Sequence, residues 1–350
     1  MKRNIIIVVL NALFLIAFIA CQLISASIIT PFHNQQAAKA WAGQSGERFA
    51  QLSVFFPESY AFDVTAIAST RHSINTKLLA ASLESDQRRV LFTDAWAAYG
   101  EVSVIGNRGN PVNASVIGVG GDFFMFHPLR LRHGSYLSPS DVMKDRVLLD
   151  EDLAWRLFGS VHLAGMEVLI NSIPFIVAGV IERESDFASR KAYEGGEGLY
   201  MHFETLDAFM DGEAKIVSYE VVMPDPVSDF AFNIIDDIFD NDSIHIVKNT
   251  NRFSFSNQLE LIRSFGERSI RTDTIVYPYW ENAVRYAEDW LALLLVLSII
   301  FLICPIVFGV IYAIKLLRFG ARQLVKLIKR LIKKRDDRAY RRYKIKQDTL

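Results

Sequence analysis

Two long runs without a charged residue stand out in the pattern of hydrophobic and polar positions along the chain. The first covers residues 5–29 and the second covers residues 291–314. Each is longer than the ~20 residues that an α-helix needs to cross the hydrocarbon core of a bilayer. The pattern therefore predicts two transmembrane helices, in residues 1–30 and 291–314, with a domain of residues 31–290 between them.

The first run also has features of a cleavable signal peptide. Two basic residues precede it, the small residues Ser25, Ala26 and Ser27 lie near its end, and Phe18–Cys21 is a poor version of a lipoprotein acylation box. The run is longer than the apolar region of about 7 to 15 residues that is typical of signal peptides, which favours an uncleaved anchor. Either reading leaves the domain on the same side of the membrane.

The first part of the domain alternates between strand and helix patterns. Residues 48–56 have the alternation and aromatic content of a strand, and apolar residues from Ile74 to Leu83 recur at helical spacing. Residues 89–97 follow as a second strand. A strand, a helix and a strand in this order favour a parallel pair.

The next stretch has a different character. Gly106–Asn110 and Asn171–Ser172 separate strand patterns, and their residues tolerate the positive φ of tight hairpin turns. Between these turns, Asp150 is placed to cap a short helix that Gly159 would end in a left-handed conformation. This stretch, about residues 112–209, is predicted to be an antiparallel, β-rich lobe.

The order of strand, helix and strand then returns, in residues 216–223, 230–239 and 244–247. One lobe is therefore expected to be built from both ends of the domain. The predicted fold class is an α+β extracytoplasmic domain of two lobes, a split β-α-β lobe with an inserted β-rich lobe, between two transmembrane α-helices.

Charge predicts the orientation in the membrane. Lys2 and Arg3 precede the first apolar run and 14 Lys/Arg follow the second, which places both termini in the cytoplasm by the positive-inside rule. The remaining 22 Lys/Arg and 36 Asp/Glu give the middle of the chain a net charge of about −14. Both cysteines, Cys21 and Cys304, lie in the apolar runs, so the domain is expected to be stable without disulfides. The expected localisation is the cell (plasma) membrane.

Motifs for catalysis and for cofactor binding are missing from the sequence. Gly120-Gly121 lacks the spacing of a dinucleotide-binding turn, and no Walker-type Gly-Lys-Ser/Thr motif occurs. The histidines form no His-Glu-x-x-His pair, there is no Gly-x-Ser-x-Gly elbow, and the acidic residues lack the spacing of a calcium loop. The chain is predicted not to be an enzyme, with no catalytic, cofactor-binding or metal-binding residues and no nucleic-acid partner.

Several motifs follow one another in the β-rich stretch. Gly118–Phe124 reads GVGGDFF, Arg146–Gly159 reads RVLLDEDLAWRLFG and Pro174–Ile181 reads PFIVAGVI, with Gly134-Ser135-Tyr136 and Val168–Ile170 in the expected places. In this order they resemble the periplasmic core domain of MacB-type (MacB/FtsX-like) ABC transporter permeases, and the resemblance extends to about Ile314. Permeases of that family have two more membrane helices, so the chain resembles a two-helix form that lacks the last two.

The resemblance implies a function without catalysis. It suggests a permease-like membrane subunit of an ABC transport or mechanotransmission complex, which couples a cytoplasmic ATPase to an extracytoplasmic domain. The implied partners are an ABC-type ATPase subunit and, as an open alternative, a second permease chain; self-association is also left open. The alternative function is a membrane-tethered extracytoplasmic binding or sensory module.

Two sets of residues are predicted to contact the membrane or a partner. Four aromatic residues before the second apolar run have the amphipathic rings that favour a membrane interface: Tyr279, Trp280, Tyr286 and Trp290. In residues 315–350, apolar residues recur at steps of three and four among basic ones, which predicts a basic amphipathic cytoplasmic helix. This tail is expected to bind anionic lipid or to dock on the ATPase, through Leu324, Ile328, Leu331, Arg322, Lys326 and Lys329.

Overall fold

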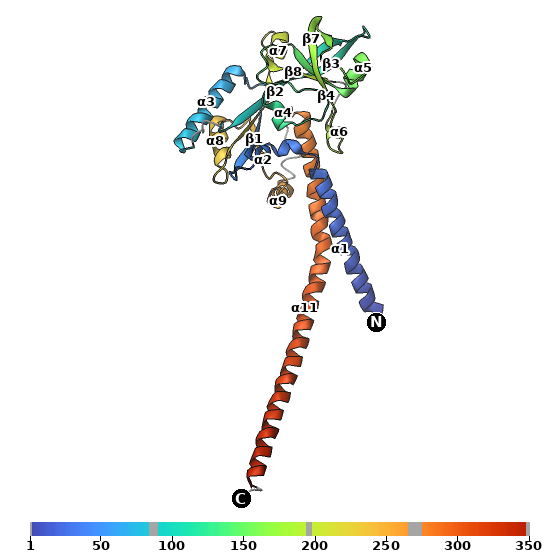
Figure 1. Ribbon diagram of the computed structural model, residues 1–350, viewed down its shortest axis with the longest axis vertical. Helices are drawn as coiled ribbons and strands as arrows, with labels where there is room; N and C mark the ends of the chain where they lie inside the picture. Colours follow the sequence, from blue (N-terminus) through green and yellow to red (C-terminus); the bar gives the residue numbers. More distant parts are fainter. Residues whose placement is uncertain (1, 84–89, 194–197, 265–274, 348–350) are drawn as a thin grey trace. The chain divides into compact units, whose positions relative to one another are not determined.

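The computed structural model describes residues 2–83, 90–193, 198–264 and 275–347 (Figure 1). The chain divides into two compact units. One unit comprises Met1–Ser25 and Leu293–Leu350, and the other comprises Ala26–Ala292.

The first unit contains most of helix α1 (Lys2–Ile29) and of helix α11 (Tyr279–Gln347). Both helices are long and apolar enough to cross a membrane, with mean hydropathies of 2.7 and 3.1 over their most apolar stretches. Within this unit the rings of Phe14 and Phe301 lie 6.0 Å apart, and Gln22 Nε2 donates a hydrogen bond of 3.0 Å to Ser298 Oγ. Gln22 and Ser298, one polar side chain from each apolar run, are therefore paired with each other, as is common between membrane helices.

The second unit is built around one sheet of ten strands in the described residues. At one end of this sheet the order is β10-β1-β9-β2, and β1 runs antiparallel to both β9 and β10. Helix α3 follows β1 and helix α8 follows β9, and the two helices contact each other beside these strands (Figure 1). The result is two interlocked split β-α-β units, the arrangement of a ferredoxin-like fold. The elements are β1 (Phe49–Phe55), α3 (Val64–Ala80), β2 (Thr93–Ile105), β9 (Ile216–Pro224), α8 (Phe230–Ile238) and β10 (His245–Lys248).

This arrangement corrects one prediction. β1 and β2 run in the same direction, but they do not pair with each other, because β9 lies between them and pairs with both. β1 and β2 each form antiparallel hydrogen bonds with β9, whereas the sequence pattern predicted a parallel pair of β1 and β2.

The rest of the sheet comes from the segment between β2 and β9. The long strands β2 and β3 pair antiparallel from Ala95 to Ile105 of β2. Beyond β3 the next strands in the sheet are β8, β5 and β7. β6 pairs with β7 and reaches back to the end of β2, so these strands form a closed ring of pairings. The pairs β3–β8 and β5–β7 are parallel, which corrects the prediction of a wholly antiparallel lobe. These strands are β3 (Pro111–Gly121), β4 (Leu131–Gly134), β5 (Arg146–Asp150), β6 (Glu167–Ile170), β7 (Ile173–Ile181) and β8 (Gly198–His202).

Local features of this segment agree with the predictions from the sequence. Asp150 Oδ1 accepts a hydrogen bond of 2.7 Å from Leu153 N and caps the helix, and Gly159 ends it with φ +72°. Asn171 and Ser172 adopt φ of +47° and +68° in the turn between β6 and β7. The predicted helix cap, helix end and hairpin are confirmed.

Apolar clusters cover both faces of the sheet. The larger cluster packs α3, α5, α7 and α8 against one face, and the smaller cluster packs α2, α4 and the start of α11 against the other. Every residue of β1 is buried, as expected for a strand covered on both sides. The remaining helices are η1 (His33–Gln35), α2 (Ala37–Ala42), α4 (Phe123–Phe126), α5 (Glu151–Phe158), α6 (Ser189–Ala192), α7 (Phe203–Phe209) and α9 (Phe255–Arg263). The mixed α+β domain between two apolar helices confirms the predicted fold class.

Candidate functional site at the base of the last helix

The first turns of α11 lie inside the folded domain. Ala283, Val284, Ala287 and Leu291 recur at steps of one, three and four residues on one side of this helix, and each is at most 1% exposed. Three of these side chains form a small cluster with Phe32, which follows α1, and with the segment around α6. The base of α11 is thus packed as a core helix of the domain.

Trp280 anchors this base in the core. Its side chain is 3% exposed and lies 4.6 Å from the ring of His127 and 5.6 Å from the ring of Phe123, between ring centroids. His127 Nε2 in turn lies 3.1 Å from Glu220 Oε2, and both of these side chains are buried. An aromatic contact therefore links the start of α11 to β9, α4 and the loop after α4.

A buried group of charges holds the same helix from the other side. Arg252, in the turn after β10, donates two hydrogen bonds to the Glu281 carboxylate, at 2.7 Å and 2.8 Å, and two to the Glu288 carboxylate, at 2.6 Å and 3.2 Å. Arg285 Nε donates a fifth, of 2.9 Å, to Glu281 Oε1. We call these four residues the Arg252 cluster. Burial by itself lowers the pKa of the Arg252 guanidinium, but the two glutamates outweigh this effect and raise the pKa above its ordinary value.

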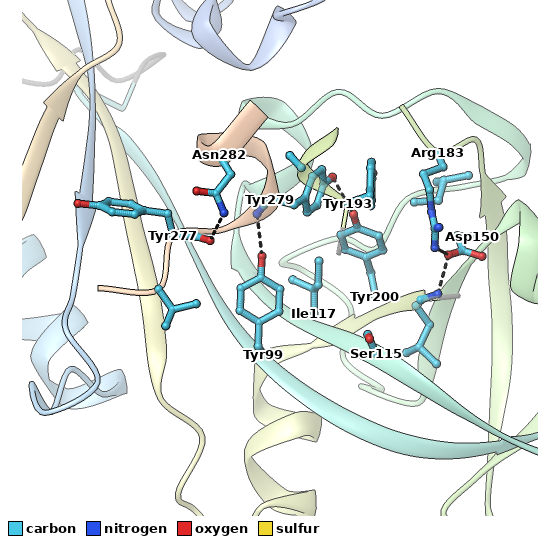
Figure 2. A pocket seen from close by; sticks show the side chains of 15 residues that line it. Tyr99, Ser115, Ile117, Asp150, Arg183, Tyr193, Tyr200, Tyr277, Tyr279 and Asn282 are labelled. Atoms are coloured by element: carbon cyan, nitrogen blue, oxygen red, sulfur yellow. Dashed lines mark hydrogen bonds and ion pairs between the residues drawn. The ribbon is translucent and has the colours of Figure 1, made fainter. Parts of the chain in front are cut away.

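A cavity of about 290 Å³ opens between the base of α11 and the sheet (Figure 2). Five tyrosines from four segments line it, and we call it the tyrosine cavity. Three contacts order them: the hydroxyls of Tyr200 and Tyr279 lie 3.1 Å apart, Tyr279 N donates to the Tyr99 hydroxyl at 3.4 Å, and Tyr193 stacks on Tyr279 at 4.3 Å. The five are Tyr99, Tyr193, Tyr200, Tyr277 and Tyr279.

Polar pairs lie at the two ends of the tyrosine cavity. At one end the Asp150 carboxylate accepts hydrogen bonds from Arg183 and from Gly198 N, and the Arg183 guanidinium lies 4.9 Å from the centre of the Tyr193 ring. At the other end Asn282 Nδ2 donates to Tyr277 O at 3.0 Å (Figure 2). The Asp150 carboxylate, the Arg183 guanidinium and the Asn282 amide nitrogen therefore each have a partner within the protein.

Burial raises the pKa of several side chains around the cavity. It raises the pKa of the Tyr99, Tyr193 and Tyr200 hydroxyls, so these remain neutral and able to donate at physiological pH. Burial also raises the pKa of Asp150 and of the neighbouring Glu184, against the opposing effect of their hydrogen bonds. The described residues contain no group of three or more His, Cys, Asp and Glu that could hold a metal ion.

The structure corrects the prediction for one of the four aromatic residues. Trp280 belongs to the interior of the domain, so its ring is not available to lipid headgroups. Tyr279 is half-buried and lines the tyrosine cavity, and its interfacial role remains a prediction. Trp290 is 40% exposed, and both Tyr286 and Trp290 contact Phe187, at 5.3 Å and 5.6 Å between ring centroids. An interfacial role for these two remains a prediction.

The predicted partner-contact residues lie in the helical tail. α11 continues through this segment, where Leu324, Ile328 and Leu331 fall on one side of the helix by their spacing and are 62%, 46% and 58% exposed. The basic residues of the predicted set fall on the opposite side: Arg322, Lys326 and Lys329. Their contacts with lipid or with an ATPase remain predictions.

Comparison with known proteins adds to this geometry. Residues 38–233 match the family model of the MacB-like periplasmic core domain. The chain is 38% identical over 92 residues to the macrolide export ATP-binding/permease protein MacB of Chromobacterium violaceum, a match that covers 26% of this chain and 13% of that protein. It is 26% identical over 162 residues to MacB of Aggregatibacter actinomycetemcomitans, covering 45% of this chain and 24% of that protein. The matched segments thus span at most about a quarter of these relatives.

Solved structures include distant likenesses. The periplasmic region of MacB from Actinobacillus actinomycetemcomitans aligns with 19% identity and a TM-score of 0.40, over 62% of this chain and 92% of that one. The extracellular domain of the ABC-type transporter YknZ aligns with 14% identity and a TM-score of 0.37, over 56% of this chain and 99% of that one. Because the family model covers more than half of the sequence, the chain belongs to the family of proteins with a MacB-like periplasmic core domain.

Proposed function

We propose that this protein is a permease-like, non-catalytic membrane subunit that couples a cytoplasmic ATPase to its extracytoplasmic domain. Membership of the MacB-like family supports this role, because the curated relatives are named as ATP-binding/permease proteins. The distribution of charge supports the orientation, since basic residues precede the first apolar run and follow the second.

One observation carries the proposal. α11 starts in the core of the domain and runs as a single helix through the apolar stretch to Gln347. A displacement of the tail along this helix would act on residues that are packed and ion-paired within the domain, rather than on a flexible linker. The Arg252 cluster and Trp280 give the helix two separate attachments to the sheet and its neighbouring turns.

The tail is the proposed contact with the ATPase. Its apolar side, with Leu324, Ile328 and Leu331, would dock on that partner, and its basic side would meet anionic lipid, each cation contributing about 1 kcal/mol near the surface. Docking of an amphipathic helix in an apolar groove is a common mode of recognition between proteins.

Affinity purification from native membranes tests the coupling. An ATP-binding cassette ATPase is expected to co-purify with the wild-type chain, and replacing Leu324, Ile328 and Leu331 with serine should release it while every charge stays in place. Val325→Ser with Ile332→Ser is the matched control, because these apolar residues point to a different side of the helix. Equal recovery of the ATPase with both variants would contradict docking through this face, and its absence from the wild-type preparation would contradict the coupling role.

A second function has its own supporting observation. The tyrosine cavity would suit a membrane-tethered binding or sensory module, since ligand sites are concave and combine apolar walls with a few polar groups. Saturable ligand binding by a chain that recovers no ATPase would favour this alternative.

A further inference from the structure

The tyrosine cavity is lined by side chains of both the sheet and the base of α11, and this arrangement does not depend on an ATPase partner. Figure 2 shows four tyrosine rings in the middle, with Asp150 and Arg183 at one end and Asn282 and Tyr277 at the other. The rings of Tyr99 and Tyr200 come from the sheet, whereas Tyr279 comes from the base of α11. A ligand in this cavity would touch the sheet and the helix at once.

The size of the cavity limits the ligand. An engineered apolar cavity of about 150 Å³ binds one benzene molecule. The tyrosine cavity, at about 290 Å³, has close to twice that volume. It therefore has room for a molecule of about two fused six-membered rings.

The charges around the cavity limit the ligand further. Asp150 and Arg183 neutralise each other, and Asp150 also accepts from Gly198 N, so this end has no unmatched charge to offer. Burial raises the pKa of the Tyr99 and Tyr200 hydroxyls, which are therefore neutral, and the Glu184 carboxyl lies beside Tyr279. An anionic ligand would lose its hydration without gaining a partner of opposite charge, whereas a neutral ligand avoids this cost.

The walls favour a planar ligand. Tyr193 and Tyr279 already stack on each other with an interplanar angle of 24°, which presents flat aromatic surface to the cavity. Aromatic pairs in offset-stacked or edge-to-face contact stabilise a complex beyond the burial of their area. We propose that the tyrosine cavity binds a neutral, planar aromatic molecule of about two fused rings that carries a hydrogen-bonding group at its edge.

The proposal has a direct consequence for α11. A ligand that stacks on Tyr279 and hydrogen-bonds to the sheet adds contacts between the base of the helix and β2, β3 and β8. Such a ligand binds better to the domain with the helix base in place than to a domain in which the helix base has moved. The ligand therefore stabilises the state in which the base of α11 packs on the sheet.

The test uses the purified full chain in detergent and 2-naphthol as the probe, with affinity measured by calorimetry. Ser115→Phe fills the cavity from an exposed position on β3 that pairs with Gly198, and it should weaken binding at least tenfold. Asn113→Phe is the matched control, because it adds the same ring to an exposed position on the same face of β3 outside the cavity. This control also accounts for partition of the probe into detergent.

Two more measurements make the test specific. The anion 2-naphthoate should bind the wild-type chain at least tenfold more weakly than 2-naphthol, because of its charge. Tyr193→Leu, which keeps an apolar side chain but removes a stacking ring, should weaken 2-naphthol binding severalfold and serves if Ser115→Phe fails to fold. The proposal is overturned if 2-naphthol does not saturate the wild-type chain, if Asn113→Phe and Ser115→Phe bind it equally, or if 2-naphthoate binds as tightly.

Discussion

Replacing Arg252 with methionine is expected to destabilise the domain strongly. The arginine side chain is 7% exposed and the Glu281 and Glu288 side chains are 1% and 13% exposed, so the change takes the Arg252 cation away from two carboxylates that water reaches poorly. Removing one partner from a buried ion pair costs about 3–5 kcal/mol. A change of 1 kcal/mol moves the unfolding temperature of a domain of this size by about 2–4 °C, so Arg252→Met should lower Tm by roughly 6–20 °C.

The matched control is Lys248→Met, four residues earlier in the chain. It removes a cation whose side chain is 44% exposed and whose partner Asp229 is 57% exposed, and such surface pairs contribute about 0–1 kcal/mol. Thermal unfolding of the full chain in detergent, followed by tryptophan fluorescence, gives both values. Adding Glu281→Gln and Glu288→Gln to Arg252→Met should recover part of the loss, because the two carboxylate charges are then gone. If Arg252→Met lowers Tm no more than Lys248→Met, the Arg252 cluster does not hold the helix base.

Three further predictions address other parts of the domain. Burial raises the pKa of Glu184 above 4.5, so the stability that its protonated form contributes is complete below about pH 4.5 and is lost as the pH rises through the folded-state pKa. Glu184→Gln should therefore raise Tm at pH 7.5 but not at pH 4. An equal change in Tm at both pH values would contradict this prediction. Gly120→Ala would place a methyl group 2.1 Å from the Trp96 ring, and the resulting overpacking should cost about 1–3 kcal/mol in denaturant unfolding; an unchanged midpoint would show that the ring moves freely. Nitroxide labels at the lipid headgroups should quench Trp290 but not the buried Trp280, so Trp290→Phe should reduce the quenching and Trp280→Phe should not.

Features that depend on neighbouring residues, such as helix caps and turns, could be predicted from the sequence. The Asp150 cap, the Gly159 helix end and the turn at Asn171 depend on residues within a few positions of one another, and all three occur in the structure. Strand partners could not be predicted in the same way. A strand-helix-strand pattern does not reveal that β9 lies between β1 and β2, because β9 is far away in the sequence and its pattern fits any buried strand.

The predicted membrane interface at the base of α11 was wrong for one residue, and the reason is related. An aromatic residue close to an apolar run is typical of a membrane interface, and this rule took no account of a helix that starts in a folded core. A signal was present, since Ala283, Ala287 and Leu291 recur at four-residue steps beside Glu281 and Arg285, which is the pattern of a helix packed in protein rather than in lipid. The tyrosine cavity left no such signal, because its residues are brought together only by the fold.

The interlocked strands also determine when the domain can fold. β1 is the first strand to be synthesised, and its neighbours are β9 and β10, so that Phe55 pairs with Ser218 on one side and with His245 on the other. The whole of the inserted segment must leave the ribosome before either neighbour exists, and closing such a long loop makes the pairing slow. Until then β1 is an apolar, strand-forming segment with both edges free, which is the kind of segment that aggregates or is bound by chaperones. Biogenesis of this protein is therefore expected to depend on holding β1 unpaired until most of the domain has been made.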